Sequence, residues 1–174
     1  MLCLMFSLEY HAARWLWLEK RCQLVLHERS PRSWACGEPD VLGITKAGFL
    51  LEIEVKRSVA DFRANAHKRC IQNRETYLKK MPKQFWFMVP PNLVEKVQPE
   101  VPQWAGLLTT ANAGWGLRVV SPAESNSASQ RLSIRECVKL MRLQTNQLMA
   151  CQERNFGLLS RIMQHEPWNE DYAI

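Results

Sequence analysis

The sequence lacks the features that would place it in a membrane or secreted class. Its six cysteines lie far apart and include no Cys-x-x-Cys pair, which argues against a zinc knuckle and against a disulfide-dense secreted scaffold. The apolar run at the start has no basic residues before it, and Glu9 and Arg14 interrupt it well short of a membrane span. No internal repeat stands out. We therefore expect reduced thiols and a cytoplasmic protein without a membrane segment.

The sequence does contain enough apolar material for one core. Its 174 residues are 47% hydrophobic, which is enough for one domain with a sizeable core and too little for two ordinary ones. The formal net charge of +6 suits a polyanionic partner, but many proteins that bind no nucleic acid share such a balance. Charge alone is therefore only a weak indication of function.

The spacing of apolar residues predicts alternating helices and strands. Ser7 can cap the first helix, and Ser58 with Asp61 can open the second in the manner of a capping box. The expected order is a helix at 8–22, strands at 23–28, 40–44 and 49–57, a helix at 58–80, strands at 84–90, 106–110 and 116–121, and a helix at 133–155. This order predicts an α/β protein with a mixed sheet flanked by helices.

A serine-rich stretch divides the chain into a core and a tail. SPAESNSASQ, residues 121–130, has the composition of a linker. We therefore predict a core at 1–122, a linker at 123–132 and a C-terminal helical tail at 133–174. The tail helix has an incomplete apolar stripe, which suits packing on the core or pairing with a second copy. Its members are Cys137, Leu140, Leu148 and Cys151, with Met141 and Met149 nearby.

The strand at 49–57 is the most informative segment, because side chains alternate across a strand. The pattern predicts one apolar core face and one charged face. The apolar face has Phe49, Leu51, Ile53 and Val55, and the other face has Leu50, Glu52, Glu54 and Lys56. Glu54 and Lys56 therefore project to the same side of the sheet, and Asp40 can reach the same place if its strand is adjacent.

Two carboxylates and a lysine at one place predict a particular chemistry. Clustered carboxylates repel one another unless a positive group lies among them, and hard oxygen ligands of this kind suit Mg²⁺ or Mn²⁺. Such a cation can orient a water molecule and stabilise charge that develops on a phosphodiester. The lysine adds a donor to the attacking water or to the phosphate.

At these residues the sequence resembles the PD-(D/E)XK nuclease superfamily. The motif reads Pro39-Asp40 followed by Glu54-Val55-Lys56. Resolvase-like members have a helix with the pattern Glu-x-x-Ala-x-x-x-Leu, which is present here as Glu9, Ala12 and Leu16, and the loop GEPD at 37–40 looks like their Gly-Glu-x-Asp. Ser58, Asp61 and Phe62, with the later FWFMVPP and WAGLL, are similar to MmcB-like DNA repair proteins. The resemblance covers about residues 7 to 122.

The resemblance implies a restriction-endonuclease-like αβββαβ core and a divalent cation, Mg²⁺ or Mn²⁺. Asp40, Glu54 and the Val55 carbonyl would hold the cation, Glu9 would assist through water, and Lys56 would position the nucleophile. The implied reaction is hydrolysis of DNA phosphodiester bonds in repair, recombination or phage DNA processing, in the cytoplasm of a bacterium or of a phage-infected host cell. Resolvase-like relatives often dimerise, which by analogy suggests a homodimer through the C-terminal helix.

The sequence leaves several interpretations of the acids open. Glu54 and Lys56 suit an ion pair on a solvated strand, and Glu52 lies on the same face and is an alternative ligand. Glu19 is the rival of Glu9, because it falls on the apolar stripe of the first helix whereas Glu9 borders it. Two loop acids, Glu28 and Glu38, are further candidate ligands.

The predicted DNA contacts lie outside the motif. Lys68 and Gln72 are one turn apart on the basic helix that begins near Ser58, where they can face the site. Trp34 lies in the loop before Asp40 and is a candidate for contact with DNA. The alternative to a nuclease is a DNA-binding or assembly module that keeps the fold without turnover.

Overall fold

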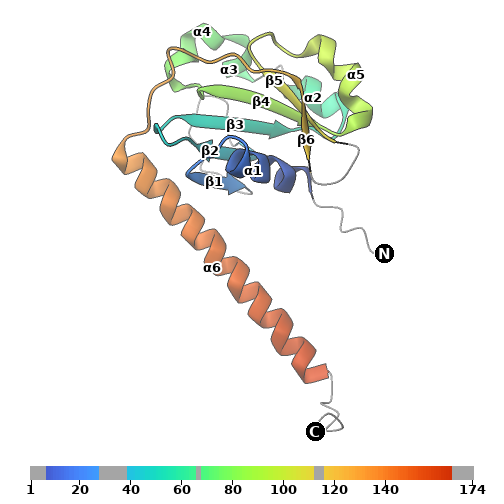
Figure 1. Cartoon of the computed structure of the whole chain (residues 1–174), viewed down its shortest axis with the longest axis vertical. Helices are drawn as coiled ribbons and strands as arrows, with labels where there is room; N and C mark the ends of the chain where they lie inside the picture. The colour runs from blue at the N-terminus through green and yellow to red at the C-terminus, as the bar shows by residue number, and fades with distance from the viewer. Residues whose placement is uncertain (1–6, 28–38, 66–67, 112–115, 166–174) are drawn as a thin grey trace.

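The chain forms one mixed sheet with helices on both faces and a long helix at its C-terminal end (Figure 1). This is a computed structural model that describes residues 7–27, 39–65, 68–111 and 116–165. The strands are β1 (Leu24–His27), β2 (Val41–Ile44), β3 (Leu50–Val55), β4 (Gln84–Val89), β5 (Gly106–Thr110) and β6 (Leu117–Ser121). The α-helices are α1 (Leu8–Leu18), α2 (Val59–Asn65), α3 (Arg69–Gln72), α4 (Arg74–Tyr77), α5 (Val94–Val97) and α6 (Ile134–His165). The predicted α/β class is confirmed.

The six strands lie in the sheet in their sequence order, from β1 to β6. The pairs β1–β2, β2–β3 and β5–β6 are antiparallel, whereas β3–β4 and β4–β5 are parallel. The parallel pairs need crossover connections, and helices provide them between β3 and β4 and between β4 and β5. The first half of the sheet is thus an antiparallel meander, and β3 lies inside the sheet with β2 on one side and β4 on the other.

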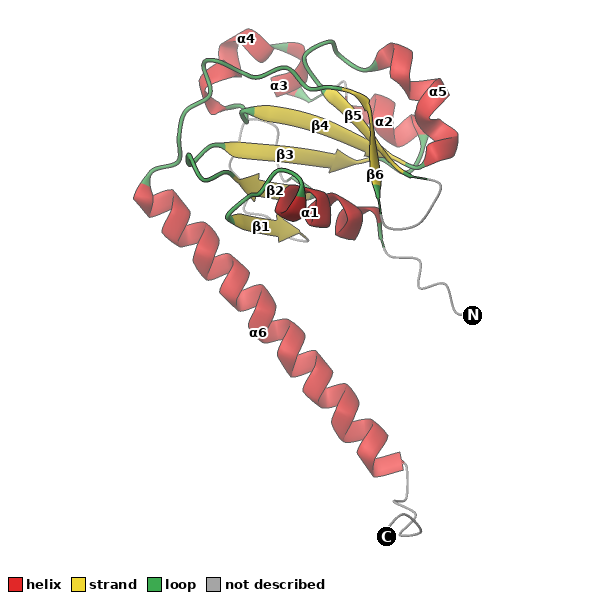
Figure 2. Cartoon of the chain, viewed as in Figure 1, coloured by secondary structure: helices red, strands yellow, loops and turns green. Residues whose placement is uncertain are grey.

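One face of the sheet is covered by α1 (Figure 2). Ala12, Trp15 and Leu16 from this helix are buried against an apolar cluster that runs across three central strands. The strand residues in this cluster include Leu51, Ile53, Val55, Trp86, Met88 and Leu108. The apolar face predicted for β3 therefore forms the core beneath α1.

The opposite face has two separate apolar clusters. Over β4 and β5, Phe85 and Phe87 pack with Phe62 of α2 and with Val94 and Val97 of α5. Over β1 and β2, a second cluster packs against the first turns of α6. It consists of Leu24, Leu26, Leu42, Ile44, Leu50 and Leu140. Leu50, at the start of β3, belongs to the second cluster, whereas Glu52 and Glu54 further along this strand belong to neither.

The predicted charged face of β3 is buried as well as the apolar one. All six residues of the strand are buried, including Glu52 and Glu54, and Lys56 directly after it is only 8% exposed. The reason is that β3 has a neighbour on each side and is covered on both faces, so alternation separates two interior environments rather than core from water. The prediction of one core face and one charged face therefore missed the burial of the charges.

The first helix begins where the sequence predicts and ends earlier. The side chain of Ser7 accepts a hydrogen bond from the amide of Tyr10 and caps the N-terminus. The helix stops at Leu18 rather than at 22, and Arg21 takes a left-handed backbone conformation with φ 51° that turns the chain into β1. Gly48, with φ 81°, makes the tight turn between β2 and β3.

The single helix predicted at 58–80 is wrong. The segment contains α2, α3, α4 and a 3₁₀ turn at Leu78–Lys80. Asn73 has φ −118° and ψ 44°, which is not helical, and separates α3 from α4. Asparagine is a weak helix former because its side chain competes for backbone hydrogen bonds, so the basic residues do not share one continuous helical face.

The serine-rich segment that follows β6 is held against the core. The amide of Asn126 donates to the carbonyl of Lys83, and its side-chain amide donates to the carbonyl of Leu78 at 2.7 Å. Asn126 and Ser129 are buried, and Ser129 donates to the carbonyl of Met81. The predicted linker thus connects β6 to α6 along a fixed path.

The helix α6 begins one residue later than predicted and extends ten residues further, to His165. Leu140 is buried in the cluster over β1 and β2, and the side-chain amide of Gln144 donates to the carbonyl of Val25. Beyond these contacts the helix runs away from the sheet (Figure 1). Among the described residues, no helix has the length and apolar character needed to cross a membrane.

The cysteines differ in part from the prediction of reduced thiols. Cys22, Cys137 and Cys151 are free, whereas Cys70 is disulfide-bonded. Sequence spacing could not indicate this bond, because a disulfide depends on which cysteines the fold brings within reach of one another. Burial raises the pKa of the Cys22 thiol to about 11, which keeps it protonated and unreactive.

Candidate functional site

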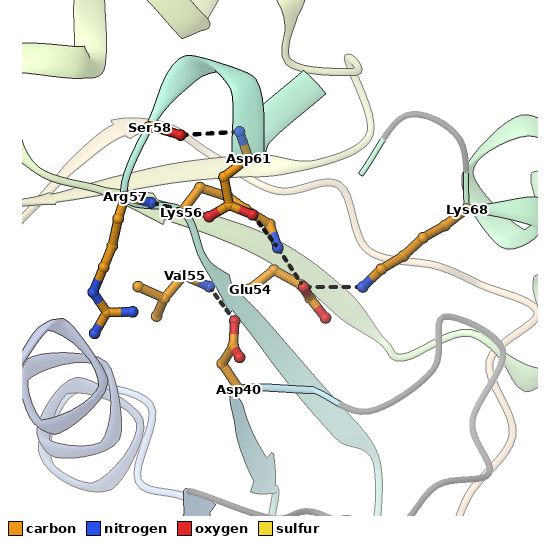
Figure 3. Close-up of polar contacts among 8 residues, drawn as sticks. All are labelled: Asp40, Glu54, Val55, Lys56, Arg57, Ser58, Asp61 and Lys68. Atoms are coloured by element: carbon orange, nitrogen blue, oxygen red, sulfur yellow. Dashed lines mark hydrogen bonds and ion pairs between the residues drawn. The ribbon is translucent and has the colours of Figure 1, made fainter. Parts of the chain in front are cut away.

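The strand register places Asp40 beside Glu54. Val41 pairs with Ile53 in the antiparallel β2–β3 ladder, so the residues just outside this pair are Asp40 and Glu54. Both belong to the face that carries Glu52, in the gap between the two apolar clusters. The convergence predicted from the sequence is therefore present, at the end of β3 where the chain passes into α2 (Figure 3).

The Asp40 carboxylate is held by the backbone of the neighbouring strand. Its Oδ2 accepts a hydrogen bond of 2.7 Å from the amide of Val55. Burial raises the pKa of Asp40, and the negative charges of Glu54 and Glu9 add to this effect, while the Val55 amide opposes it. The structure thus shows the Val55 amide engaged at the site, and a role for the Val55 carbonyl as a ligand stays a prediction.

Glu54 is a buried acid with two lysine partners on one oxygen. Its Oε2 lies 2.9 Å from Nζ of Lys56 and 3.0 Å from Nζ of Lys68, while the side chain of Glu54 is only 2% exposed. The other oxygen, Oε1, is buried and has no hydrogen-bond partner. The Glu54–Lys56 pair is therefore not the solvated strand pair that the sequence left open.

Glu52 is a second buried acid on the same face. Burial, with a further contribution from the charge of Glu54, raises its pKa to about 8, while Lys68 acts in the opposite direction. Its Oε1 is buried without a hydrogen-bond partner. Glu52 therefore holds a proton at neutral pH, so its carboxyl group is a weaker candidate ligand than the carboxylate of Glu54.

The helix acid Glu9 lies at the edge of the site and is paired. Both of its oxygens accept from Nη2 of Arg57, at 2.7 and 2.8 Å. Burial on its own would raise the pKa of Glu9, but the backbone amide of Glu9 and the guanidinium of Arg57 lower it below its usual value. The rival Glu19 caps the other end of α1 and is exposed, so Glu9 is the acid of α1 that lies near Asp40.

Asp61 of α2 supports the end of β3. Its Oδ2 accepts from the amide of Arg57, its own amide donates to the hydroxyl of Ser58, and its Oδ1 lies 3.9 Å from Nζ of Lys56 (Figure 3). The sequence predicted the Ser58–Asp61 cap. Sequence reasoning missed that Arg57 pairs with Glu9, and the only signal was the position of an arginine directly after the Glu-x-Lys motif.

The predicted DNA contacts have different outcomes. Lys68 lies at the site, where it pairs with Glu54. Gln72 is exposed at the end of α3, where its backbone amide donates to the carbonyl of Lys68 at 3.1 Å, and its side chain is not among the groups that pair with Glu54. Trp34, together with Glu28 and Glu38, lies outside the described residues.

Asp40 and Glu54 have the chemistry that a hard divalent cation prefers. Within residues 7–27, 39–65, 68–111 and 116–165, no three histidine, cysteine or acidic side chains gather closely enough to hold a metal ion by themselves. Mg²⁺, however, is usually held by one or two carboxylates, with waters and substrate phosphates as its other ligands. The orphaned Oε1 of Glu54 is a buried acceptor without a donor, and together with Asp40 it fits such a cation.

Comparison with protein-family models gives no match for this sequence, and comparison with curated proteins gives none either. A solved structure of a protein of unknown function from Silicibacter pomeroyi is similar, with 21% sequence identity and a TM-score of 0.52. The alignment covers 96% of this chain and 100% of that chain. At this level of identity, the likeness supports the fold.

Proposed function

We propose that this protein is a metal-dependent nuclease that hydrolyses DNA phosphodiester bonds, in DNA repair, recombination or phage DNA processing. The observation that carries the proposal is the pairing of Asp40 with Glu54 across β2 and β3, with Lys56 beside them. Buried acids at adjacent strand ends cost stability, because their repulsion and desolvation are unfavourable, so their presence here supports a functional role. The resemblance of the Pro-Asp and Glu-x-Lys motifs to PD-(D/E)XK nucleases supports the same reading.

In this proposal each residue has one task. Asp40 and Glu54 hold the cation, with the Val55 carbonyl as a further ligand and Glu9 acting through water. A cation bound there supplies positive charge against a phosphate and lowers the pKa of a bound water. Lys56 donates a hydrogen bond to the attacking water or to the phosphate, and Arg57 and Asp61 keep Glu9 and Lys56 in position.

A second candidate is a DNA-binding or assembly module with the same fold and no turnover. It is favoured by the two ammonium groups on Oε2 of Glu54, which satisfy that charge without a cation. It is disfavoured by Asp40, since a module that only binds DNA gains nothing from a second acid near the phosphate. An RNA or nucleotide hydrolase would use the same chemistry. It is distinguished from a DNA nuclease by which substrate it cleaves.

The test is cleavage of branched, single-stranded and duplex DNA, and of RNA, with Mg²⁺ or Mn²⁺. We expect Asp40→Ala, Glu54→Ala and Lys56→Ala each to lower the rate by a factor of at least about 10². Circular dichroism and thermal unfolding show whether each variant is folded. Glu95→Ala, which removes an exposed acid of α5, is the matched control and should keep the wild-type rate.

The outcomes separate the candidates. If folded wild-type protein binds DNA but cleaves none of these substrates with either cation, the binding module is the correct reading. If only RNA is cleaved and the three variants lose that activity, the chemistry stands and the substrate class is wrong. If the variants cleave as fast as wild type, the activity comes from elsewhere.

A further inference from the structure

We infer that Lys68 neutralises Glu54 while no cation is bound, and that it contacts the DNA phosphate once a cation has bound. This inference rests on the proposed function and adds to it a residue that contacts the substrate. In the structure, Oε2 of Glu54 has two ammonium partners at 2.9 and 3.0 Å, and Lys68 is the one that comes from outside the motif. Lys56 is adjacent on the same strand segment, whereas Lys68 reaches in from the turn before α3 (Figure 3).

The two lysines differ in how firmly they are held. The side chain of Lys56 is 10% exposed and also lies near Asp61, whereas the side chain of Lys68 is 32% exposed. A long flexible side chain with a partly solvated ammonium can leave a pair at low cost. Lys68 is therefore the partner that a second positive charge on Glu54 would displace.

A displaced Lys68 would lie beside the phosphate that the cation is expected to bind. A cation on Oε1 of Glu54 would share one carboxylate with the ammonium of Lys68 on Oε2, and positive charges this close repel in a buried site, so occupation of Glu54 by a cation favours release of Lys68. Its ammonium then becomes a donor for a phosphate oxygen at the same opening. Lys68 would thus contribute to DNA affinity only when the cation is present.

Cation binding by the protein alone tests the first half of this inference. We would titrate wild type, Lys68→Met and Lys80→Met with Mn²⁺ and measure free Mn²⁺ by electron paramagnetic resonance. Methionine keeps the length of the side chain and removes its charge, and Lys80 is an exposed lysine away from the site. We expect Lys68→Met to bind Mn²⁺ about tenfold more tightly than wild type, since it removes a competing charge. Lys80→Met should match wild type.

DNA affinity tests the second half. In EDTA, Lys68→Met should bind duplex DNA as wild type does, because Lys68 is occupied by Glu54. With Ca²⁺, which prefers the same oxygen ligands, Lys68→Met should bind about tenfold more weakly than wild type. A loss of affinity that is equal in both conditions would mean that Lys68 is a constant phosphate contact and would overturn the inference.

The failures can be told apart. If wild type binds Mn²⁺ and Lys68→Met binds it no more tightly, the counter-ion inference fails and the proposed function stands. If folded wild type binds no Mn²⁺ at all, with or without DNA, the proposed cation site itself fails.

A different observation, on α6, carries a second inference. We propose that α6 pairs with α6 of a second copy of this chain in an antiparallel arrangement. Exposed side chains, all but one of them apolar, recur along the helix with alternating spacings of four and three residues, as in a two-stranded seam. They are Ile134, Val138, Met141 and Leu148, with Thr145 in the same row, and they are 84%, 42%, 58% and 60% exposed in the order named. This row lies beside the side that carries Leu140, which is already buried on the core.

The charges at the edge of this row favour a second copy in the antiparallel direction. Arg135 and Glu153 are both exposed, and about five full turns of 3.6 residues separate them, so they lie on one line along the helix. In an antiparallel pair related by a two-fold axis near Thr145, Arg135 of one copy approaches Glu153 of the other, on both sides of the axis. In a parallel pair the same two residues would stay far apart.

The two free cysteines of α6 report the direction directly. Cys137 and Cys151 lie along the other edge of the row, and about four turns separate them, so a short thiol cross-linker cannot join them within one helix. We expect a short bismaleimide to link Cys137 of one copy to Cys151 of the other, as read by mass spectrometry of the digest. Links of Cys137 to Cys137 would show a parallel pair and overturn the inference.

Sedimentation tests the pairing itself. We expect wild type to be a dimer at micromolar concentration and the double variant Met141→Glu, Leu148→Glu to be a monomer with an unchanged thermal unfolding midpoint of the core. Ala150→Glu adds a charge on the opposite side of the helix and should stay dimeric. Arg135→Glu and Glu153→Arg should each weaken the dimer several-fold, and the two together should restore it. A monomeric wild type at these concentrations would refute the pairing.

Discussion

The two faces of β3 are both buried, but they are built from different residues. Beneath α1, Leu51 and Ile53 belong to one apolar cluster that crosses the centre of the sheet. On the opposite face, Glu52 and Glu54 occupy the gap between two apolar clusters, and each has an oxygen without a partner. Burial of acids without full hydrogen bonding is unfavourable for stability, which is why we place the proposed function on the second face.

The two faces also contribute differently to the stability of the fold. The α1 face supplies apolar burial, which is the main favourable contribution to folding. The acidic face supplies little of this and depends on lysines from two segments to compensate its charge. Substitutions on the two faces should therefore change stability in opposite ways.

The largest effect on stability is expected on the α1 face. Ile53→Ala should lower the free energy of unfolding by about 2–5 kcal/mol, because it removes a fully buried side chain and leaves a cavity. Urea unfolding followed by circular dichroism measures this. Val119→Ala, at a half-exposed site on β6, is the control and should cost about 0.5 kcal/mol or less. A similar small loss for Ile53→Ala would mean that α1 does not cover a packed core.

On the acidic face, the expected effect depends on pH. The folded pKa of Glu52 is about 8 and its ordinary value is 4.5, so between these values the folded chain holds a proton that the unfolded chain has lost. Stability contributed by neutral Glu52 is therefore complete below about pH 4.5 and is lost as the pH rises through about 8. Glu52→Gln removes this titration. We expect its free energy of unfolding, relative to wild type, to increase between pH 5 and pH 8 by an amount on the order of a few kcal/mol.

Urea unfolding of wild type and Glu52→Gln at several pH values measures this difference. Taking the difference removes the contribution of the acids that titrate alike in both proteins. Parallel stability curves across this range would show that Glu52 is ionised in the folded protein, and the contrast between the two faces would then be weaker.

The α1 face is also closely packed at Gly106. A side chain on Gly106 would meet the ring of Trp86, which occupies the space beside β5. Gly106→Ala should therefore cost about 1–3 kcal/mol and change the tryptophan fluorescence. At Gly116 an added Cβ would meet Ala111 at 3.5 Å, an ordinary contact, so Gly116→Ala should leave stability nearly unchanged. Equal effects of the two substitutions would show that the Trp86 ring can move freely.

The smallest effect is expected at the edge where the two faces meet. Arg57→Ala removes the bidentate pair with Glu9, but the Arg57 side chain is 62% exposed, so the loss should be below about 1 kcal/mol. The loss should shrink at high salt, and the pKa of Glu9 should rise, as an NMR titration can show. Arg63→Ala, which breaks a solvent-exposed pair with Glu100, is the control and should leave the Glu9 titration unchanged. An unchanged Glu9 in Arg57→Ala would mean that the pair does not form in solution.

The sequence predicted the strands and the meeting of Asp40 with Glu54, since both follow from local patterns. Alternation identifies β3, and an antiparallel neighbour with Asp40 just before it leaves few possible registers. The burial of Glu52 could not be predicted, because an alternating acid looks the same on a solvated face and on a covered one. Its environment depends on the apolar clusters on either side of it, to which α5 and α6 contribute from far away in the sequence.

Contacts between separate segments also explain the other differences between the predicted and the observed site. Lys68 was expected to contact DNA directly, whereas in the structure it lies just before α3 and pairs with Glu54, in a segment that periodicity predicted as one helix. The bond between Arg57 and Glu9 joins residues that are far apart in the chain. Local propensity describes each segment on its own, whereas these contacts are set by how the segments pack together.

The hydrogen bonds around Asn126 have a consequence for how α6 acts. The chain between β6 and α6 is hydrogen-bonded to the carbonyls of Leu78 and Lys83, so the start of α6 is held in place against the core. With 32 residues at about 1.5 Å each, α6 is a rod of roughly 48 Å. Whatever binds its far half is therefore held at a set distance and angle from the acids of β3, as an arm of fixed reach.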